Sequence, residues 1–249
     1  MVQLFPKQKK TKLPALISPA DLAVRYARGI SLPEKAVLCP FGPLVKQLIT
    51  PAWKKYNCFA EIYVSPDRKY SWIVPTGVGA ASAALAAEIG VALGVKQLIF
   101  IGTAAGLQEE LEINDWMVCA GSLCDDGVSP SYVSATVVTP HTTLTRALRR
   151  QITAAKQPYH YGLNWTTEAL LRETKAEVRH YQRQQILSVE METSAVLAVC
   201  KKRRVCAAVA YVISDTLHTG KWQFSSSFAP TMKSLRALGN CAVRALTLP

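Results

Sequence analysis

The sequence predicts one α/β domain, and three features of its 249 residues support this fold class. An apolar run over 205–213, rich in Val and Ala, ends abruptly at Ser214 and Asp215, as strands buried on both faces do. A similar run covers Gln97–Ile101. Between such strands lie segments of helical character, and the clearest is the Ala-rich stretch over 80–93. A length of 249 residues suffices for one domain with a large core.

The first quarter of the chain is expected to be a short arm followed by the start of the domain. Residues 1–12 are basic and are predicted to form a mobile arm, which leaves 13–249 for the domain. Ser18 and Pro19 suit the N-cap and first position of a helix that runs to about Ala27. The next elements expected are a short strand over 36–39 and hairpin strands over 61–64 and 70–74.

The remaining elements follow from glycine positions and apolar spacing. The helix over 80–93 is preceded by a glycine turn, and the strand over 97–101 leads into a second turn over 102–106. Further along, we expect a strand over 115–122, helices over 142–153, 177–184 and 234–246, and a helix opened by the acidic triplet at 190–192. Residues 222–228 are predicted to form a loop over a pocket at the end of the 205–213 strand.

Composition argues against several classes of function. The net charge is +12, from 29 Lys and Arg against 17 Asp and Glu, but the basic residues are scattered and accompany no nucleic-acid-binding motif. We therefore expect no nucleic-acid partner and read the positive field as attractive to anions such as phosphate. The most apolar window, 71–95, contains Pro75 and Glu88 and does not suit a membrane span.

Cysteine and histidine usage predicts a reduced, metal-free protein. The seven Cys are dispersed, odd in number and form no C-x-x-C pair, which favours buried thiols in a cytoplasmic protein. The four His form no cluster with the spacing of metal ligands. The basic N-terminus lacks the apolar segment of a signal peptide. We expect no metal, no cofactor and no membrane partner.

Three blocks of sequence together resemble a known family. They are V-E-M-E-T-S-A over 189–195 followed by I-S-D over 213–215, L-I-F-I-G-T-A-A-G-L-Q over 98–108, and P-T-G-V-G-A-A-S over 75–82. In this order and spacing they resemble the purine nucleoside phosphorylase and uridine phosphorylase superfamily, which also contains nucleoside hydrolases. The resemblance covers roughly 35–245. It implies a mixed central sheet, partly barrel-like and flanked by helices, in a homo-oligomer (dimer, trimer or hexamer).

The resemblance also assigns roles for binding and cleaving a nucleoside. Glu192 is expected to accept hydrogen bonds from the ribose hydroxyls, with Met191 packed under the sugar. Asp215 is the expected general acid near purine N7, and an Asp here favours a purine. Other expected substrate contacts come from the glycine turns, an aromatic segment and both acidic motifs: Gly79, Thr103, Ala104, Ala105, Tyr161, Glu190 and Ser214. Without the resemblance, charge at a helix N-terminus is the favoured explanation of Glu190 and Glu192, and a turn or N-cap position is that of Asp215.

The phosphate site departs from the family pattern. Val45 and Phe100 stand where the phosphorylases have arginines, so phosphate would have to rely on Thr103, on Gly42 and on Lys54. Three functions stay open. The first is phosphorolysis of a nucleoside with inorganic phosphate as co-substrate, the second is hydrolysis, and the third is binding of a nucleoside or nucleotide without catalysis.

Overall fold

A computed structural model describes residues 6–248, and within them a mixed sheet dominates the fold. Its strands are β1 (Lys35–Leu38), β2 (Lys54–Asn57), β3 (Ala60–Val64), β4 (Ser71–Pro75), β5 (Gln97–Gly106), β6 (Trp116–Cys124), β7 (Val137–Val138), β8 (His160–Thr166), β9 (Ile186–Glu190), β10 (Cys206–Thr216) and β11 (Gln223–Phe224). The helices are α1 (Lys7–Lys10), α2 (Pro19–Tyr26), α3 (Gly42–Leu48), α4 (Ala80–Ala92), α5 (Thr142–Ala154), α6 (Lys175–Arg183), α7 (Thr193–Arg203) and α8 (Ala229–Thr247), with 3₁₀ turns at Ser129–Ser131 and Leu170–Arg172.

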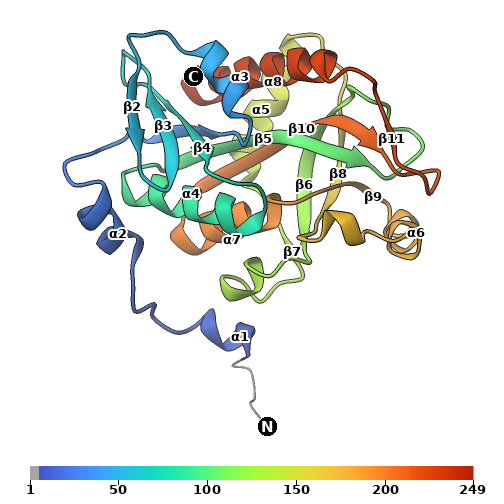
Figure 1. Ribbon diagram of the computed structural model, residues 1–249, viewed down its shortest axis with the longest axis horizontal. Helices are drawn as coiled ribbons and strands as arrows, with labels where there is room; N and C mark the ends of the chain where they lie inside the picture. The colour runs from blue at the N-terminus through green and yellow to red at the C-terminus, as the bar shows by residue number, and fades with distance from the viewer. Residues whose placement is uncertain (1–5, 249) are drawn as a thin grey trace.

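Part of the sheet closes on itself into a barrel. Strand β5 pairs in parallel with β10 along most of its length and antiparallel with β9 at its end. The ring is completed because β10 pairs with β6, β6 with β8 and β8 with β9. Strands β1, β4, β3 and β2 continue from β5 as an open extension (Figure 1). The predicted mixed and partly barrel-like sheet is confirmed.

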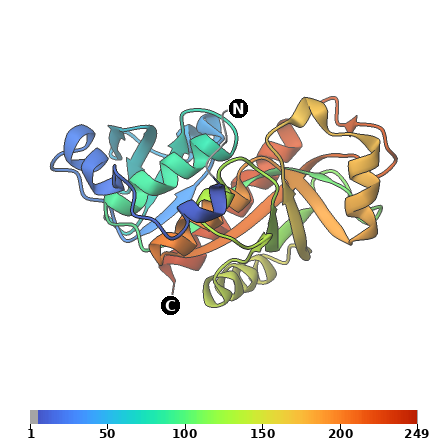
Figure 2. The ribbon, with the colours of Figure 1, turned by 90° about the horizontal axis from the view of Figure 1, so that it is seen from below.

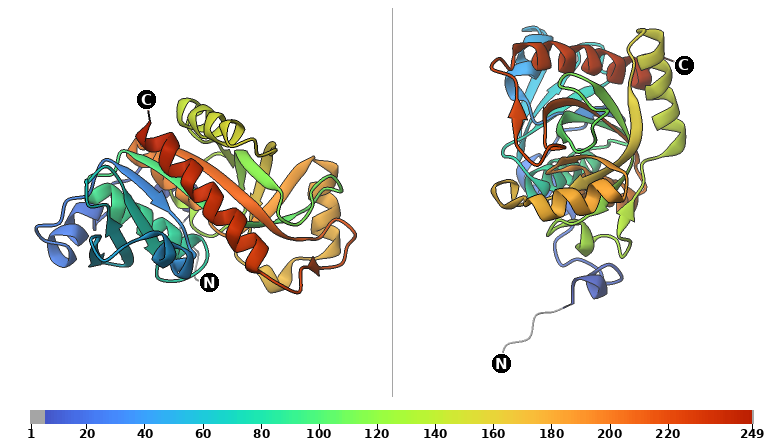
Figure 3. Two further views of the ribbon diagram at one scale, coloured as in Figure 1. Left: turned by 90° about the horizontal axis from the view of Figure 1, so that it is seen from above. Right: turned by 90° about the vertical axis from the view of Figure 1, so that its right-hand side faces the viewer.

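Helices cover the sheet on two sides, as predicted. Helices α4 and α7 pack together on one side, where Val196, Val199 and Ile89 belong to one buried cluster (Figure 2). On the other side α8 lies across the sheet beside α5, and Leu235 and Leu148 belong to a second buried cluster (Figure 3). Each strand of the sheet centre therefore supplies apolar side chains to both faces, which is why its sequence is continuously apolar.

Most of the expected elements form within a few residues of their predicted bounds. Ser18 caps α2 in a capping box with Asp21. One prediction was wrong: residues 102–106 are not a turn but the end of β5, because they hydrogen-bond to β10 and β9. The acidic triplet at 190–192 does not open the helix as a unit, because Glu190 ends β9 and α7 begins at Thr193.

Two further segments differ from their expected form. Lys54, a tentative phosphate contact, lies with Lys55 on edge strand β2, an element that the sequence analysis did not predict, and both lysines are exposed. Within the arm predicted over 1–12, α1 forms a short helix in which the Lys7 Nζ donates to the Gly127 carbonyl oxygen at 3.0 Å. Residues 1–5 of that arm lie outside the described residues. None of the helices in the described part of the chain combines the length and apolar character of a membrane span.

Candidate active site

A cavity of about 670 Å³ opens at the carboxyl ends of β5, β9 and β10. This is the edge at which α/β sheets bind ligands, and the volume lies in the range of small-molecule sites. Its walls come from the ends of these strands, the segment before α6 and the loop after β10. The lining residues are Pro40, Phe41, Val78, Thr103, Ala104, Ala105, Leu170, Leu171, Glu173, Thr174, Lys175, Val178, Val189, Glu190, Met191, Glu192, Ser214, Asp215, Leu217, Gly220, Lys221 and Trp222.

Glu192 is held at the cavity wall by the backbone of Gly79. The Gly79 N–H donates to Glu192 Oε1 at 2.5 Å, which links the starts of α4 and α7. Gly79 has φ 88° and ψ 171°, a conformation open to glycine and strained for other residues. Burial, followed by the charge of Glu190, raises the pKa of Glu192 to about 7. The Gly79 N–H thus orients Glu192, the residue expected to bind the ribose hydroxyls, and the expected contact of Gly79 with substrate stays a prediction.

Glu190 supports the site from inside the protein. One carboxylate oxygen accepts from the Thr166 hydroxyl at 2.6 Å and from Asn164 Nδ2 at 2.8 Å. The other accepts from the backbone N–H groups of Glu192 and Thr193, both at 2.8 Å. These two N–H groups belong to the start of α7, where a helix leaves donors unpaired. Although Glu190 lines the cavity, its oxygens are engaged by the protein, so it positions Glu192 and the start of α7.

A buried polar network inside the barrel fixes Glu190 in turn. Asn164 donates to Ser122 Oγ at 3.0 Å and accepts from Ser188 Oγ at 2.8 Å, and Thr166 Oγ1 lies 2.8 Å from Ser122 Oγ. The pKa of Glu190 is raised by burial, and the hydrogen bonds from Thr166, Asn164 and the backbone oppose that shift. Side chains from three strands therefore hold the Glu190 carboxylate in place, directly or through one another. The sequence of each strand taken alone does not identify them as part of a site.

Asp215 enters the cavity because β10 bulges at Ser214. The pairing with β5 shifts between Ile213 and Asp215, so Ser214 and Asp215 both line the cavity although they are adjacent. Asp215 Oδ1 accepts from the Ser214 hydroxyl at 2.6 Å, and Oδ2 accepts from Trp222 Nε1 at 2.9 Å. The loop over 222–228, predicted to cover the pocket, thus supplies one of the two partners of the expected acid.

Sequence reasoning missed a fourth cavity carboxyl, Glu173. It follows the 3₁₀ turn before α6 and lines the cavity together with Asp215. Burial, then the charges of Asp215 and Glu177, raise the pKa of Glu173 to about 7. Nothing in the sequence of this segment shows that Glu173, rather than Arg172, faces the cavity.

The expected phosphate end of the cavity is apolar and is formed by Pro40, Phe41 and Thr103. Val45 is fully buried, and the Phe100 ring packs edge-on against Tyr211 with ring centroids 6.5 Å apart. Side chains of the core therefore fill the positions where the family resemblance places arginines. Among the described lining residues, the cations are Lys175 and Lys221, which come from α6 and from the loop after β10.

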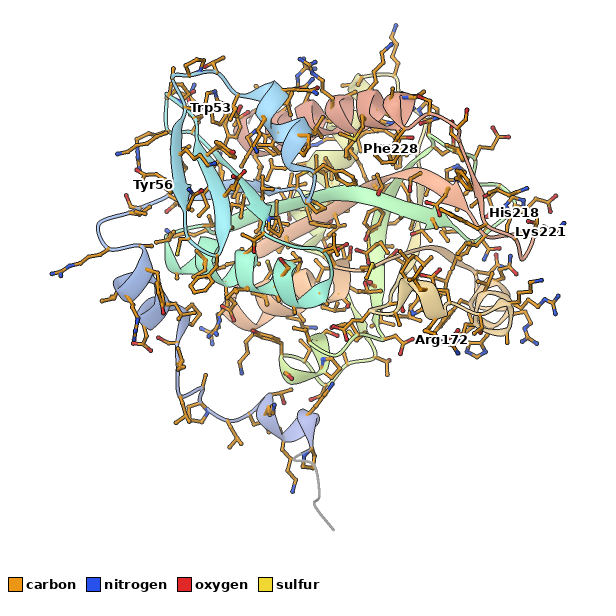
Figure 4. All side chains as sticks on the ribbon, viewed as in Figure 1. Trp53, Tyr56, Arg172, His218, Lys221 and Phe228 are labelled. Carbon is orange, nitrogen blue, oxygen red and sulfur yellow. The ribbon has the colours of Figure 1, made fainter. Side chains whose placement is uncertain are left out.

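Two tentative phosphate ligands lie outside the cavity lining of this chain. Lys54 sits on edge strand β2, and its Nζ lies 5.3 Å from the centroid of the Tyr56 ring. Trp53 and Tyr56, on either side of it, lie at the opposite end of the molecule from His218 and Lys221 (Figure 4). Gly42 is the first residue of α3, next to Phe41, and does not line the cavity itself.

The aromatic wall expected from the segment around Tyr161 comes from elsewhere. Tyr161 lies outside the cavity lining and is 48% exposed, with the Arg149 guanidinium 4.4 Å from its ring centroid. Alternation along β8 turns its side chain away from the barrel interior, where Asn164 and Thr166 point. The flat apolar surface at the cavity comes instead from Trp222, with Leu170 and Leu171 nearby in the lining.

Comparison with known proteins places this chain in a family. The sequence profile of the phosphorylase superfamily matches residues 36–244. The chain belongs to the phosphorylase superfamily. Members of this superfamily in the comparison include a guanosine phosphorylase from Halorubrum lacusprofundi, 28% identical over 158 residues that cover 62% of this chain and 65% of the relative. A purine nucleoside phosphorylase of DeoD type from Clostridium perfringens is 27% identical over 130 residues, covering 51% and 55%.

Solved structures share the fold over most of the phosphorylase-superfamily chain. Uridine phosphorylase from Vibrio fischeri superposes with a TM-score of 0.74 at 18% identity, covering 88% of this chain and 93% of the other. AMP nucleosidase from Bacteroides thetaiotaomicron superposes with a TM-score of 0.70 at 17% identity, covering 86% and 89%. At these identities the likeness shows the fold.

In the described residues, no group of three or more His, Cys, Asp and Glu could hold a metal ion.

Proposed function

We propose that this phosphorylase-superfamily protein cleaves the N-glycosidic bond of a purine nucleoside. The observation that carries the proposal is that Glu192 and Asp215, from different elements, line one apolar-walled cavity in which each carboxylate is already oriented by a hydrogen bond. Cleavage of a nucleoside needs two carboxyl groups with different tasks, because the sugar offers hydroxyl donors and the base must receive a proton as it leaves. A protein that only binds nucleosides has no need for an acid beside the base.

In the proposed reaction, ionised Glu192 accepts hydrogen bonds from the ribose 2′- and 3′-hydroxyls, and Met191 packs under the sugar. Asp215 in its protonated form donates to N7 as the C1′–N9 bond breaks, so the electron pair of that bond leaves with a neutral base. The Ser214 hydroxyl can keep its contact with Asp215 in either protonation state, because a hydroxyl both donates and accepts. A nucleophile on the Thr103 side then attacks C1′ of the oxocarbenium-like sugar.

Phosphorolysis is the first candidate for this last step, with inorganic phosphate as co-substrate and no other cofactor. The two sequence relatives described above are phosphorylases, and Thr103 lines the cavity, where it could bind the anion. The product would be the free base and ribose 1-phosphate.

Hydrolysis is the second candidate, and one specific observation favours it. The positions where the resemblance places arginines hold the buried side chains of Val45 and Phe100, so neither position supplies a guanidinium to offset the charge of phosphate. Water needs no such charge. In this case Thr103 would orient the water, and the products would be the free base and ribose.

Product analysis separates the candidates. Purified protein is incubated with guanosine, inosine, adenosine, 5′-methylthioadenosine or uridine, each with and without phosphate. Free purine base with ribose 1-phosphate, only in the presence of phosphate, supports phosphorolysis. Free base with ribose in either condition supports hydrolysis. If no base is released from any of the five nucleosides, cleavage of these substrates is rejected, and thermal stabilisation by the same nucleosides then tests the non-catalytic binder.

A homo-oligomer is part of the proposal. Large apolar side chains from the loop after β10 and from the 3₁₀ turn are exposed beside the cavity mouth: Leu171, Trp222, Phe224 and Phe228 are 93%, 65%, 59% and 45% exposed. Clustered exposure of this kind is typical of association surfaces. Light scattering on a size-exclusion column should give a mass at least twice the 27.2 kDa of the chain.

A further inference from the structure

The fold brings together two basic segments that are far apart in the sequence. The first is the arm that contains α1, and the second is the end of α7 at 201–204. They touch, because the Lys202 Nζ donates to the Thr11 carbonyl oxygen at 2.6 Å. Residues that are scattered along the sequence therefore form one basic surface. Its cations, all of them exposed, are Lys7, Lys9, Lys10, Lys12, Lys201, Lys202 and Arg204.

Acidic side chains do not neutralise the basic surface. The sequence contains no Asp or Glu over 1–20 or over 193–214. At the end of α7, Arg203 pairs with the buried Glu88 and is not counted in the surface. Within the described residues, the seven cations of the surface form no ion pair with a carboxylate. Because like charges gathered in one place repel each other, an anionic partner would stabilise this arrangement.

Large apolar side chains continue the basic surface toward α2. Leu16 is fully exposed, and Leu13 and Ile17 are more than half exposed, in the segment that joins α1 to α2 (Figure 1). Leu13 is tied to the arm, because its N–H donates to the Lys10 carbonyl oxygen at 3.1 Å. Lysines beside exposed aliphatic side chains are typical of proteins that lie on a bilayer. The cations attract anionic headgroups, and the apolar side chains enter the interface.

We propose that the basic surface, together with Leu13, Leu16 and Ile17, binds the surface of an anionic lipid bilayer. A nucleic acid would match the cations but would gain little from three aliphatic side chains, because its phosphates and bases are bound by polar and aromatic groups. A second copy, paired through the same patch, would cover the apolar side chains but would bring seven further cations to the same place. An anionic bilayer satisfies both parts of the surface.

The proposed lipid contact is separate from the cavity. Glu192 lies at the start of α7, whereas the basic surface lies at its end. The 11 residues of α7 place these two ends roughly 16 Å apart. Lipid binding can therefore be measured whether or not the protein cleaves a nucleoside, and failure of one proposal leaves the other standing.

The test measures how the full chain partitions onto lipid vesicles in a sedimentation assay. Vesicles of phosphatidylcholine with about one third phosphatidylserine should bind the protein, and phosphatidylcholine alone should not. Binding should weaken as salt is added, because salt screens the headgroup charge. Replacing Lys9, Lys10 and Lys12 together by glutamine should weaken partition roughly 100-fold, since each cation near an anionic surface contributes about fivefold. Leu16→Ser should weaken it roughly tenfold, because one apolar side chain is withdrawn from the interface.

A matched control removes the same charge from the other side of the sheet. Arg150 on α5 and Lys233 and Arg236 on α8 are exposed, and these helices cover the face opposite to α7. The triple variant Arg150→Gln, Lys233→Gln, Arg236→Gln should change partition by less than about threefold, because only charges next to the bilayer contribute strongly. Thermal unfolding of all variants should match that of wild type, since every exchanged side chain is exposed.

The proposal is overturned if wild type does not bind phosphatidylserine vesicles at low salt, or if the control variant loses as much binding as the variant of the arm. A fluorescent oligonucleotide that binds through Lys9, Lys10 and Lys12 and is indifferent to Leu16→Ser, with no vesicle binding, would overturn it in favour of a nucleic-acid partner. A lower oligomeric mass of Leu16→Ser, again with no vesicle binding, would overturn it in favour of an interface between copies.

Discussion

Replacing Asp215 by asparagine removes the transferable proton and little else. The asparagine carbonyl oxygen can accept from Trp222 Nε1, and its amide can donate to the Ser214 hydroxyl, so the contacts of 2.9 and 2.6 Å both keep a donor and an acceptor. Each retained bond is worth about 1 kcal/mol, so the free energy of unfolding should change by less than about 1 kcal/mol. Nucleoside affinity should change by a similar amount at most.

Turnover should fall far more. General acid catalysis contributes about 10²–10⁴ in rate, which corresponds to about 3–5 kcal/mol of activation free energy. We expect Asp215→Asn to lower kcat for guanosine and inosine by this factor, measured by single-turnover release of the base, while calorimetry shows a nearly unchanged Kd. The difference between the two effects is the signature of an interaction made only in the transition state.

A substrate that needs no acid provides the control for this prediction. In 4-nitrophenyl riboside the leaving group departs as a stable anion, so Asp215→Asn should cleave it at close to the wild-type rate. The general-acid role is refuted if the nitrophenyl riboside suffers the same loss as guanosine. It is refuted equally if kcat for guanosine falls by less than tenfold, or if Kd rises as much as kcat falls.

Three further predictions follow from the contacts of the site and its helices. Glu192→Gln should weaken guanosine binding about tenfold or more, measured by calorimetric titration. Wild type should lose affinity as pH falls through about 7, where its Glu192 carboxylate is protonated, and the variant should not. Binding of 2′,3′-dideoxyguanosine should show neither effect. Gly79→Ala should destabilise the fold by about 1–3 kcal/mol in urea unfolding and weaken nucleoside binding, because its φ of 88° suits only glycine; unchanged binding would contradict the orienting role of the Gly79 N–H. Arg203→Met should cost about 3–5 kcal/mol in the same assay, because it strips the buried Glu88 of contacts at 2.8 and 2.9 Å, and adding Glu88→Gln should restore most of the loss.

Local patterns in the sequence were sufficient to predict many elements. The apolar run ending at Ser214 and Asp215 indicated a buried strand, and Ser18 with Pro19 indicated the start of a helix. These predictions succeed because burial on both faces and capping leave their mark within a few consecutive residues. The motif around Glu192 likewise predicted residues that line the cavity. It did not show which role each of the neighbouring carboxylates has.

The predictions that differed from the structure depended on contacts between distant segments. The 102–106 segment has the glycines of a turn, but pairing with β9 and β10 extends it into a strand. Tyr161 belongs to an aromatic-rich segment, yet strand alternation turns it toward Arg149. Phe100 replaces an expected arginine, but only the packing against Tyr211 shows that a core side chain fills that position.

The sequence by itself determined the fold class, the family and the two carboxylates that the proposed reaction uses, because strand burial, helix caps and short motifs are properties of neighbouring residues. Only the tertiary structure decided which role each of the carboxyl groups has. Glu190 turns inward to a network from three strands, Glu192 is held by the Gly79 N–H, and Glu173 lines the same cavity as Asp215. These roles depend on which groups from remote segments surround each carboxyl, and closure of the barrel is what brings those groups together.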